Sequence, residues 1–235
     1  MTAWLFLLFV TVIASGYLFF IFDTSKFLKY ISCFGGAFLL AVCFVDILPE
    51  IFSKGSDTLL CSLFILIGFL LQLLLELISA GAEHGHLHTD NTQSNHRSTS
   101  RLTPIMLLIG VSIHAFFEGL ALITDNEINK SLLTGIIIHN IPISIVIVGL
   151  VMQNNNSKLR AFSMLSIFAA MSVAGALVGH YSILMVRYTH IALSLVVGIL
   201  LHVSVSTLFV NEQNRRYNVI HILIVVTAFA LVLLL

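Results

Sequence analysis

The sequence predicts an all-α polytopic membrane protein with about eight spanning helices in a single domain, residues 1–235, and two observations predict this class. First, 58% of the 235 residues are hydrophobic and 9% are charged, whereas an average soluble domain is about 25% charged. Second, apolar runs close to the roughly 20 residues that cross a hydrocarbon core alternate with short polar breaks. A soluble protein with eight buried helices is disfavoured, because too few polar residues remain for its surface.

Eight apolar runs supply the predicted spans. In chain order they are 3–22, 28–48, 59–78, 103–124, 131–152, 162–179, 191–210 and 219–235. The first run is long for a signal-peptide core and no basic residue precedes it, so we expect a retained span. Cys33, Cys43 and Cys61 are an odd number in apolar surroundings, which predicts buried thiols with no disulfide framework.

Lysine and arginine fall mainly on one side of the predicted bundle. Eight follow odd-numbered spans, namely Lys26, Lys29, Arg97, Arg101, Lys158, Arg160, Arg215 and Arg216, and three follow even-numbered spans, namely Lys54, Lys130 and Arg187. The basic side of a membrane protein faces the cytoplasm, so both termini are predicted outside. The formal net charge is +0 with no basic stripe, which gives no indication of a nucleic-acid partner.

One long polar loop, residues 81–102, separates helices one to three (1–80) from helices four to eight (103–235). We expect this cytoplasmic loop to be disordered, because it is rich in Ser, Thr, Asn and Gln. His84, His86 and His88 alternate along it, and such histidines can bind transition metals weakly. The alternative is a solvated linker with no ligand role.

Span four places two ionisable residues deep in an apolar run. His114 and Glu118 are four residues apart, so they project from one helical face. Counting from residue 103 at about 1.5 Å per residue puts His114 roughly 16 Å deep, near the midplane. Buried charges of this kind usually face a bundle interior or a wet cavity. The pattern predicts a metal site, and the alternative is a structural ion pair.

Span five adds a second histidine at a matching depth. His139 and Asn140 are followed by Pro142, which lacks an N–H and kinks a helix. Counting from residue 131 on the other side places His139 roughly 12 Å deep. Imidazole and carboxylate suit zinc, iron and related ions. We therefore predict a metal site of His114, Glu118, His139 and Asn140, although His139 alone would fit a hydrogen-bonded core histidine.

Three further residues are weaker candidates for metal contacts. Asp46 and Glu50, at the outer end of span two, could attract cations at an outer mouth or be ordinary interfacial charges. His202, one turn before Ser206 in the inner half of span seven, fits either a pathway group or a helix-contact histidine. Glu76, near the inner end of span three, is expected at the interface.

Motifs in three spans resemble those of the ZIP (Zrt-, Irt-like protein) family of metal transporters. Residues 114–121 read HAFFEGLA, similar to the family's span-four signature, His-Ser/Asn-x-x-Glu-Gly. Residues 139–142 read HNIP, similar to its span-five signature, and residues 44–50 read FVDILPE, similar to a span-two segment ending in His/Asp-x-Leu-Pro-Glu. The resemblance covers most of the chain. It implies an eight-helix bundle with inverted three-helix repeats around helices four and five.

Four positions depart from the family pattern. Ile143 stands where many members have a glutamate, and Asn140 where an acidic residue often follows the histidine. Ala115 replaces a Ser or Asn, and Thr207 aligns with an acidic position of span seven. These changes remove most ligands of a second metal, so the resemblance implies one ion per site.

The resemblance implies transport of a divalent metal ion toward the cytoplasm, zinc first and iron or manganese next, by an elevator-like shift of the metal-bearing helices. It implies no cofactor, because the metal is cargo, and no enzyme activity. The expected location is the plasma or inner membrane, with the lipid bilayer and the metal ion as partners and a homodimer left open. The alternative function is an intramembrane metal-dependent hydrolase. A third is a structural or signalling membrane protein.

Overall fold

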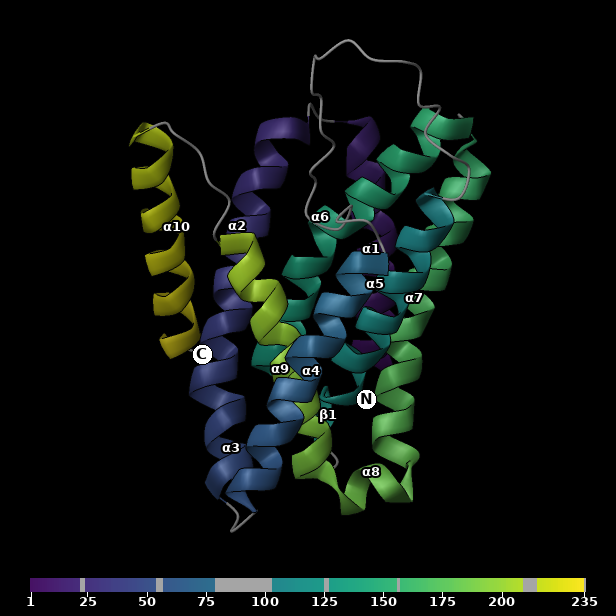
Figure 1. The fold of residues 1–235 in the computed structure, drawn as a ribbon. Helices are drawn as coiled ribbons and strands as arrows, with labels where there is room; N and C mark the ends of the chain where they lie inside the picture. Colours follow the sequence, from purple (N-terminus) through teal and green to yellow (C-terminus); the bar gives the residue numbers. More distant parts are fainter. Residues whose placement is uncertain are drawn as a thin grey trace.

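The structure is a computed structural model, and it describes residues 1–21, 24–53, 57–78, 103–124, 127–155, 157–208 and 215–234. Helices make up nearly all of this part of the chain (Figure 1). Within it, six helices are long and apolar enough to cross a membrane, and Ile105–Leu120 and Val219–Leu234 are shorter apolar helices. The predicted class, an all-α polytopic membrane protein, is therefore confirmed.

The elements follow the predicted spans closely. In chain order they are α1 (Thr2–Tyr17), the 3-10 turn η1 (Leu18–Phe20), α2 (Thr24–Val42), the π-helical turn η2 (Cys43–Ile47), α3 (Leu48–Ser53), α4 (Thr58–Ile78), α5 (Thr103–Leu120), β1 (Ile123–Thr124), β2 (Glu127–Ile128), α6 (Lys130–Asn155), α7 (Lys158–Tyr181), α8 (Ile183–Arg187), α9 (Thr189–Leu208) and α10 (Arg215–Leu234).

Two spans differ from their predicted limits. Span four was expected to reach residue 124, but α5 ends at Leu120 and an antiparallel hairpin, β1–β2, follows. The backbone N–H of Asn129 donates to the carbonyl of Leu122 across the hairpin, and its side-chain Oδ1 accepts the N–H of Leu132 and so caps the start of α6. Span two continues through η2 into α3. Pro49 cannot donate to the carbonyl of residue 45, and the π turn lies directly before it.

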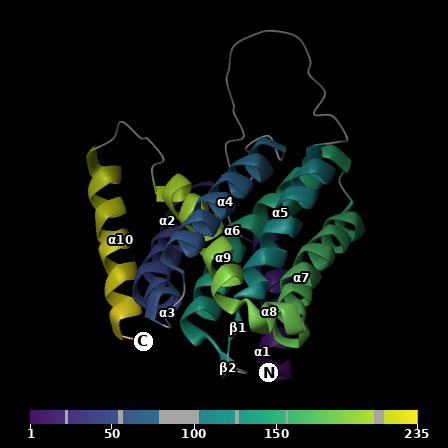
Figure 2. The ribbon, with the colours of Figure 1, turned by 60° about the horizontal axis from the view of Figure 1, so that its bottom comes forward.

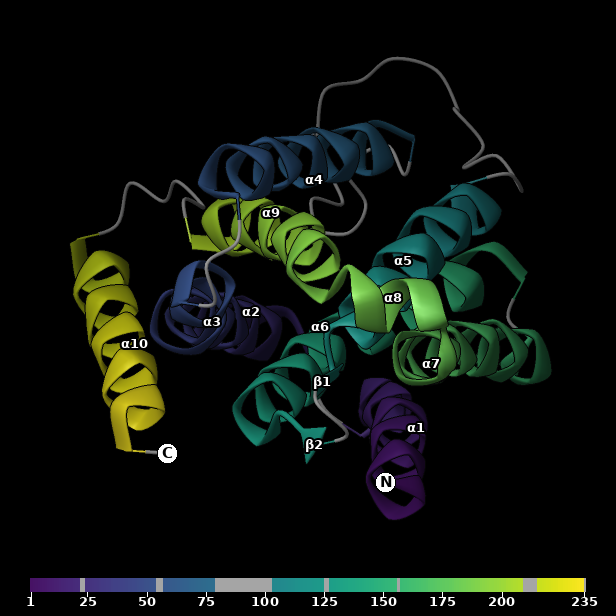
Figure 3. The same cartoon turned by 90° about the horizontal axis from the view of Figure 1, so that it is seen from below.

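The long helices form two bundles, which are defined here by their packing. The first bundle contains α1, α5, α6 and α7, and the second contains α2, α4, α9 and α10 (Figure 3). The closest packing in the first bundle is α5 on α7, and the closest in the second is α4 on α9. The bundles meet mainly where α2 lies against α6, with smaller contacts of α5 on α4 and α9. The inverted three-helix repeat itself stays a prediction.

Both chain ends lie at the same end of the molecule. Figures 1 and 2 show α1 starting, and α10 ending, at the end that also carries α3, α8 and the β1–β2 hairpin. We call this the terminal end, and the end where α4 stops and α5 begins the opposite end. An even number of crossings places the two termini together, as the lysine and arginine count also predicts. That the terminal end faces outward stays a prediction.

The three cysteines are buried and free, as the apolar context predicted. The loop histidines His84, His86 and His88 lie outside the described residues. The residues that matter most for a metal site are in the middle of α5 and α6, both of which belong to the first bundle.

Candidate metal site

α5 presents one acid and one imidazole from the same face. His114 and Glu118 are one helical turn apart, and Nε2 of His114 lies 3.1 Å from Oε1 of Glu118. Their side chains are 1% and 0% exposed. Gly119 follows at once, and a Cβ there would collide with the carbonyl oxygen of Ser172 on α7. The glycine therefore lets α5 approach α7 closely and holds the Glu118 side of the helix inside the protein.

α6 brings a second imidazole to the same place. His139 is 3% exposed, and its ring centroid lies 5.9 Å from that of His114, with the two rings at 73°. One ligand atom each from His114, Glu118 and His139 all lie within 4.8 Å of one another. Pro142 stands within α6 three residues later and leaves the carbonyl of residue 138 without its usual helical donor.

The three ligand atoms fit a first-row divalent cation after a small closure. Four tetrahedral ligands at 2.0–2.1 Å from zinc lie about 3.3 Å apart. Separations of up to 4.8 Å must therefore shorten by up to about 1.5 Å on binding, by our arithmetic from these zinc distances. Side-chain rotation alone can achieve this, because each ligand sits on a separate χ1 and χ2 pair.

Two neighbouring groups also fit a cation. Neither carboxylate oxygen of Glu118 has a hydrogen-bond donor in the described part of the chain. The side-chain amide of Asn140 is 1% exposed, and neither its nitrogen nor its oxygen has a hydrogen-bond partner there. A buried polar group left unsatisfied costs about 1–3 kcal/mol. A bound ion with its waters would satisfy both residues.

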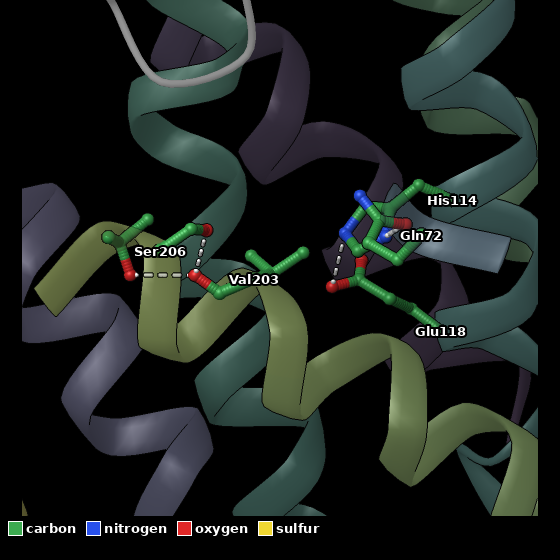
Figure 4. Close-up of polar contacts among 6 residues, drawn as sticks. Gln72, His114, Glu118, Val203 and Ser206 are labelled. Atoms are coloured by element: carbon green, nitrogen blue, oxygen red, sulfur yellow. Dashed lines mark hydrogen bonds and ion pairs between the residues drawn. The ribbon is translucent and has the colours of Figure 1, made fainter. Parts of the chain in front are cut away.

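The other candidate ligands lie apart from this group. Among the described residues, His, Cys, Asp and Glu form one cluster of three or more that could hold a metal, and it consists of His114, Glu118 and His139. Asp46 lies in η2 and Glu50 in α3, both half-buried toward the terminal end. Thr207 donates its hydroxyl to the carbonyl of Val203, and so does Ser206 (Figure 4).

His202 contacts a different acidic residue. Its Nε2 lies 3.6 Å from Oε2 of Glu76 on α4, and its ring meets that of Phe69 edge-on at 4.8 Å. The side chain of Glu76 is 27% exposed and that of His202 is 7% exposed. Glu76 was expected at the interface, which stays a prediction, and the structure adds that it is the partner of a buried histidine.

Sequence reasoning missed Gln72 entirely. It lies on α4 with 0% exposure, and its Oε1 is 3.0 Å from Nδ1 of His114 (Figure 4). The available signal was a lone amide 14 residues into an apolar span, one turn before Glu76. Gln72 and Glu76 share a helical face, and this face looks toward His114 and His202.

The two sides of the cluster differ in polarity. Toward the terminal end, fully buried apolar side chains follow it, namely Phe38, Leu39, Leu122, Leu132 and Ile136. Toward the opposite end, the polar groups of Gln72, His202 and Glu76 continue along α4 and α9. Buried apolar side chains also lie on this second side, among them Leu107 and Val111 on α5 and Ile147 on α6, so the polar groups there form a line along α4 and α9 alone.

Comparisons with known proteins agree on one kind of relative. A family model described as the ZIP zinc transporter matches residues 79–235. A protein of Danio rerio named Zinc transporter ZIP1 is 27% identical over 195 residues, which are 65% of this chain and 64% of that protein. The chain thus spans somewhat less than two thirds of that relative's length. No solved structure matches the chain.

Proposed function

The chain belongs to the ZIP zinc transporter family, and from this premise we propose that it carries a divalent metal ion across a membrane toward the cytoplasm. The observation that supports this most is the buried group of His114, Glu118 and His139 in the middle of two helices. Members of this family are transporters and not enzymes, so the hydrolase alternative is set aside. The metal is cargo, and no cofactor is invoked.

We propose zinc as the preferred ion. Two imidazoles and one carboxylate are ligands that zinc accepts readily. The family's description as zinc transporters and the name of the Danio rerio relative both favour zinc. Iron and manganese remain alternatives, because selectivity among such ions depends on geometry and supply as well as on ligand type.

One ion per site follows from the surroundings of His139. Ile143 is 5% exposed and packs in an apolar cluster with Val111, Ala115 and Leu165. A second cation beside the first would need further carboxylates, and this cluster supplies methyl groups instead. Asn140 can add an amide oxygen to the first ion.

The remaining candidates fit a route through the protein. Asp46 and Glu50 would attract cations at the outer mouth, and His202 with Glu76 would receive the ion on its way inward. His84, His86 and His88 would gather it at the cytoplasmic end. In this orientation the termini are outside, and the membrane is the plasma or inner membrane. We also propose a homodimer, which native mass spectrometry can test.

Uptake of radiolabelled zinc by proteoliposomes tests the proposal. We expect His114→Ala and Glu118→Gln to reduce uptake to that of empty vesicles, because each removes one ligand of a three-residue site. His221→Ala is the matched control, since His221 lies on α10, which packs on α2 away from the cluster. Zinc uptake that both site variants retain, in protein that still elutes as folded, would overturn the proposal.

A further inference from the structure

Gln72 meets His114 across the boundary between the two bundles. The amide of Gln72 is fully buried on α4 and belongs to the second bundle, whereas His114 belongs to the first. The 3.0 Å separation of Oε1 from Nδ1 is that of an ordinary hydrogen bond. Burying an amide in lipid surroundings costs free energy unless the amide is hydrogen-bonded. The hydrogen-bonded arrangement of Gln72 is therefore strongly favoured over one without this contact.

The direction of this bond follows from the atoms. The side-chain oxygen of Gln72 can only accept, so Nδ1 of His114 must carry the proton and donate it. When the ring is neutral, as binding a metal through Nε2 requires, this bond leaves Nε2 with its lone pair. Nε2 is the atom that faces Oε1 of Glu118 at 3.1 Å. Nε2 of His114 and Oε1 of Glu118 then both offer lone pairs in a site shielded from water, and a cation can bind to both.

We propose that Gln72 is a positioning residue that holds His114 in the Nδ1-protonated tautomer and so makes Nε2 the metal ligand. The inference rests on the proposed function, and it adds a residue from α4 to a site otherwise built from α5 and α6. Outer partners of metal-bound histidines fix ring orientation in this way, and losing one typically lowers metal affinity about 10–100-fold.

The location of Gln72 gives the bond a second property. A hydrogen bond weakens steeply when its atoms separate by even about 1 Å. Any sliding of α5 along α4 therefore breaks the contact and releases the ring of His114. The ligand set is complete in the conformation described here, and it loosens when the two bundles move relative to each other.

Two substitutions separate positioning from packing. Gln72→Met keeps the length of the side chain and removes the acceptor, whereas Gln72→Glu keeps an acceptor oxygen at the same reach. Leu73→Met is the matched control, because Leu73 is the next residue on α4 and is exposed on the outer surface of the bundle. Purified protein is titrated with zinc against a chelating dye, and zinc uptake is measured in proteoliposomes.

We expect Gln72→Met to weaken zinc binding and raise KM about 10–100-fold with a smaller change in maximal rate, and Gln72→Glu to bind within a few-fold of wild type. Equal losses in Gln72→Met and Gln72→Glu would show a packing role and overturn the proposal, as would unchanged binding in Gln72→Met. If Gln72→Met does not fold, Gln72→Asn replaces it, since its amide is one methylene too short to reach.

A metal-free measurement keeps this test independent of transport. Nitrogen-15 spectra of histidine-labelled protein, assigned with His114→Ala, report which ring nitrogen carries the proton. We expect the Nδ1-protonated form for His114 in wild type and its loss in Gln72→Met. A wild-type ring protonated at Nε2 alone would overturn the inference. Failure of zinc uptake together with the expected spectrum would instead count against the proposed function.

Discussion

The helix contacts within each bundle differ from those between the bundles. Within the first bundle, a Cβ on Gly175 of α7 would collide with the carbonyl oxygen of Phe116 on α5. Within the second, a Cβ on Gly198 of α9 would collide with the carbonyl oxygen of Ile65 on α4, and one on Gly68 with that of Leu195. In both bundles, backbone lies directly against backbone.

The boundary between the bundles combines side-chain contacts with a backbone contact. Gly135 on α6 faces the side chains of Leu39 and Phe38 on α2. Gly35 on α2 faces backbone instead, and a Cβ there would lie 3.1 Å from Cα of His139. Backbone contacts of the first kind fix two helices together, whereas side chains can exchange neighbours. Both kinds of contact occur at the boundary, and we call the contact of Gly35 with His139, which lies beside the metal site, the joint.

The largest effect is expected inside a bundle. Gly175→Ala and Gly198→Ala each place a methyl group on a carbonyl oxygen that belongs to another helix, and the backbone must separate to admit it. We expect a loss of about 3 kcal/mol in stability, seen as a lower Tm and a lower yield of folded protein in detergent. If both variants kept the wild-type Tm, the contacts within the bundles would not differ in stability from the contacts between them.

A smaller effect on stability and a larger one on transport are expected at the joint. Gly35→Ala requires the backbone of His139 to shift by a few tenths of an ångström. We expect a stability loss of about 1 kcal/mol and a decrease in zinc affinity of about tenfold, because a displaced ligand binds less well. Calorimetric unfolding and dye-competition titration separate the two effects. A large decrease in Tm with unchanged zinc affinity would show that Gly35 behaves like Gly175 and Gly198, which pack against backbone within a bundle.

The smallest effect is expected at a glycine that faces a movable ring. A Cβ on Gly149 of α6 would lie 3.1 Å from the edge of Phe19, whose ring can turn aside. Alanine is also favoured over glycine in a helix by about 1 kcal/mol, which offsets the contact. We expect Gly149→Ala to leave Tm and zinc uptake close to wild type, so it serves as the reference for the other three variants.

The sequence predicted much of this arrangement because helix geometry is regular. A rise of about 1.5 Å per residue was enough to place His114 and His139 at similar depths, and the structure does bring them together with Glu118. Their role as metal ligands stays a prediction. The class of fold followed from composition, since a chain with so few charges needs lipid around it.

Other features depended on contacts that apolar patterns do not encode. Leu122 and Ile123 are as apolar as any span residue. They nevertheless lie just before and within the β1–β2 hairpin, and the chain becomes helical again only at α6, where Asn129 caps the first turn. Gln72 carries no charge, so it did not stand out within its span. Glu76 looked interfacial because its partner, His202, is 126 positions away in the sequence.

The buried cluster contains a single carboxylate, and this has an electrical consequence. Counted as formal charges, two neutral imidazoles and an ionised Glu118 give the empty cluster one negative charge, and a bound divalent cation would change this to one positive charge. Moving one elementary charge through a membrane potential is worth about 2.3 kcal/mol per 100 mV. In the elevator-like shift that the family resemblance implies, a potential that is negative inside would therefore draw the loaded site inward and drive the empty site back outward, so the same voltage would favour both halves of the cycle.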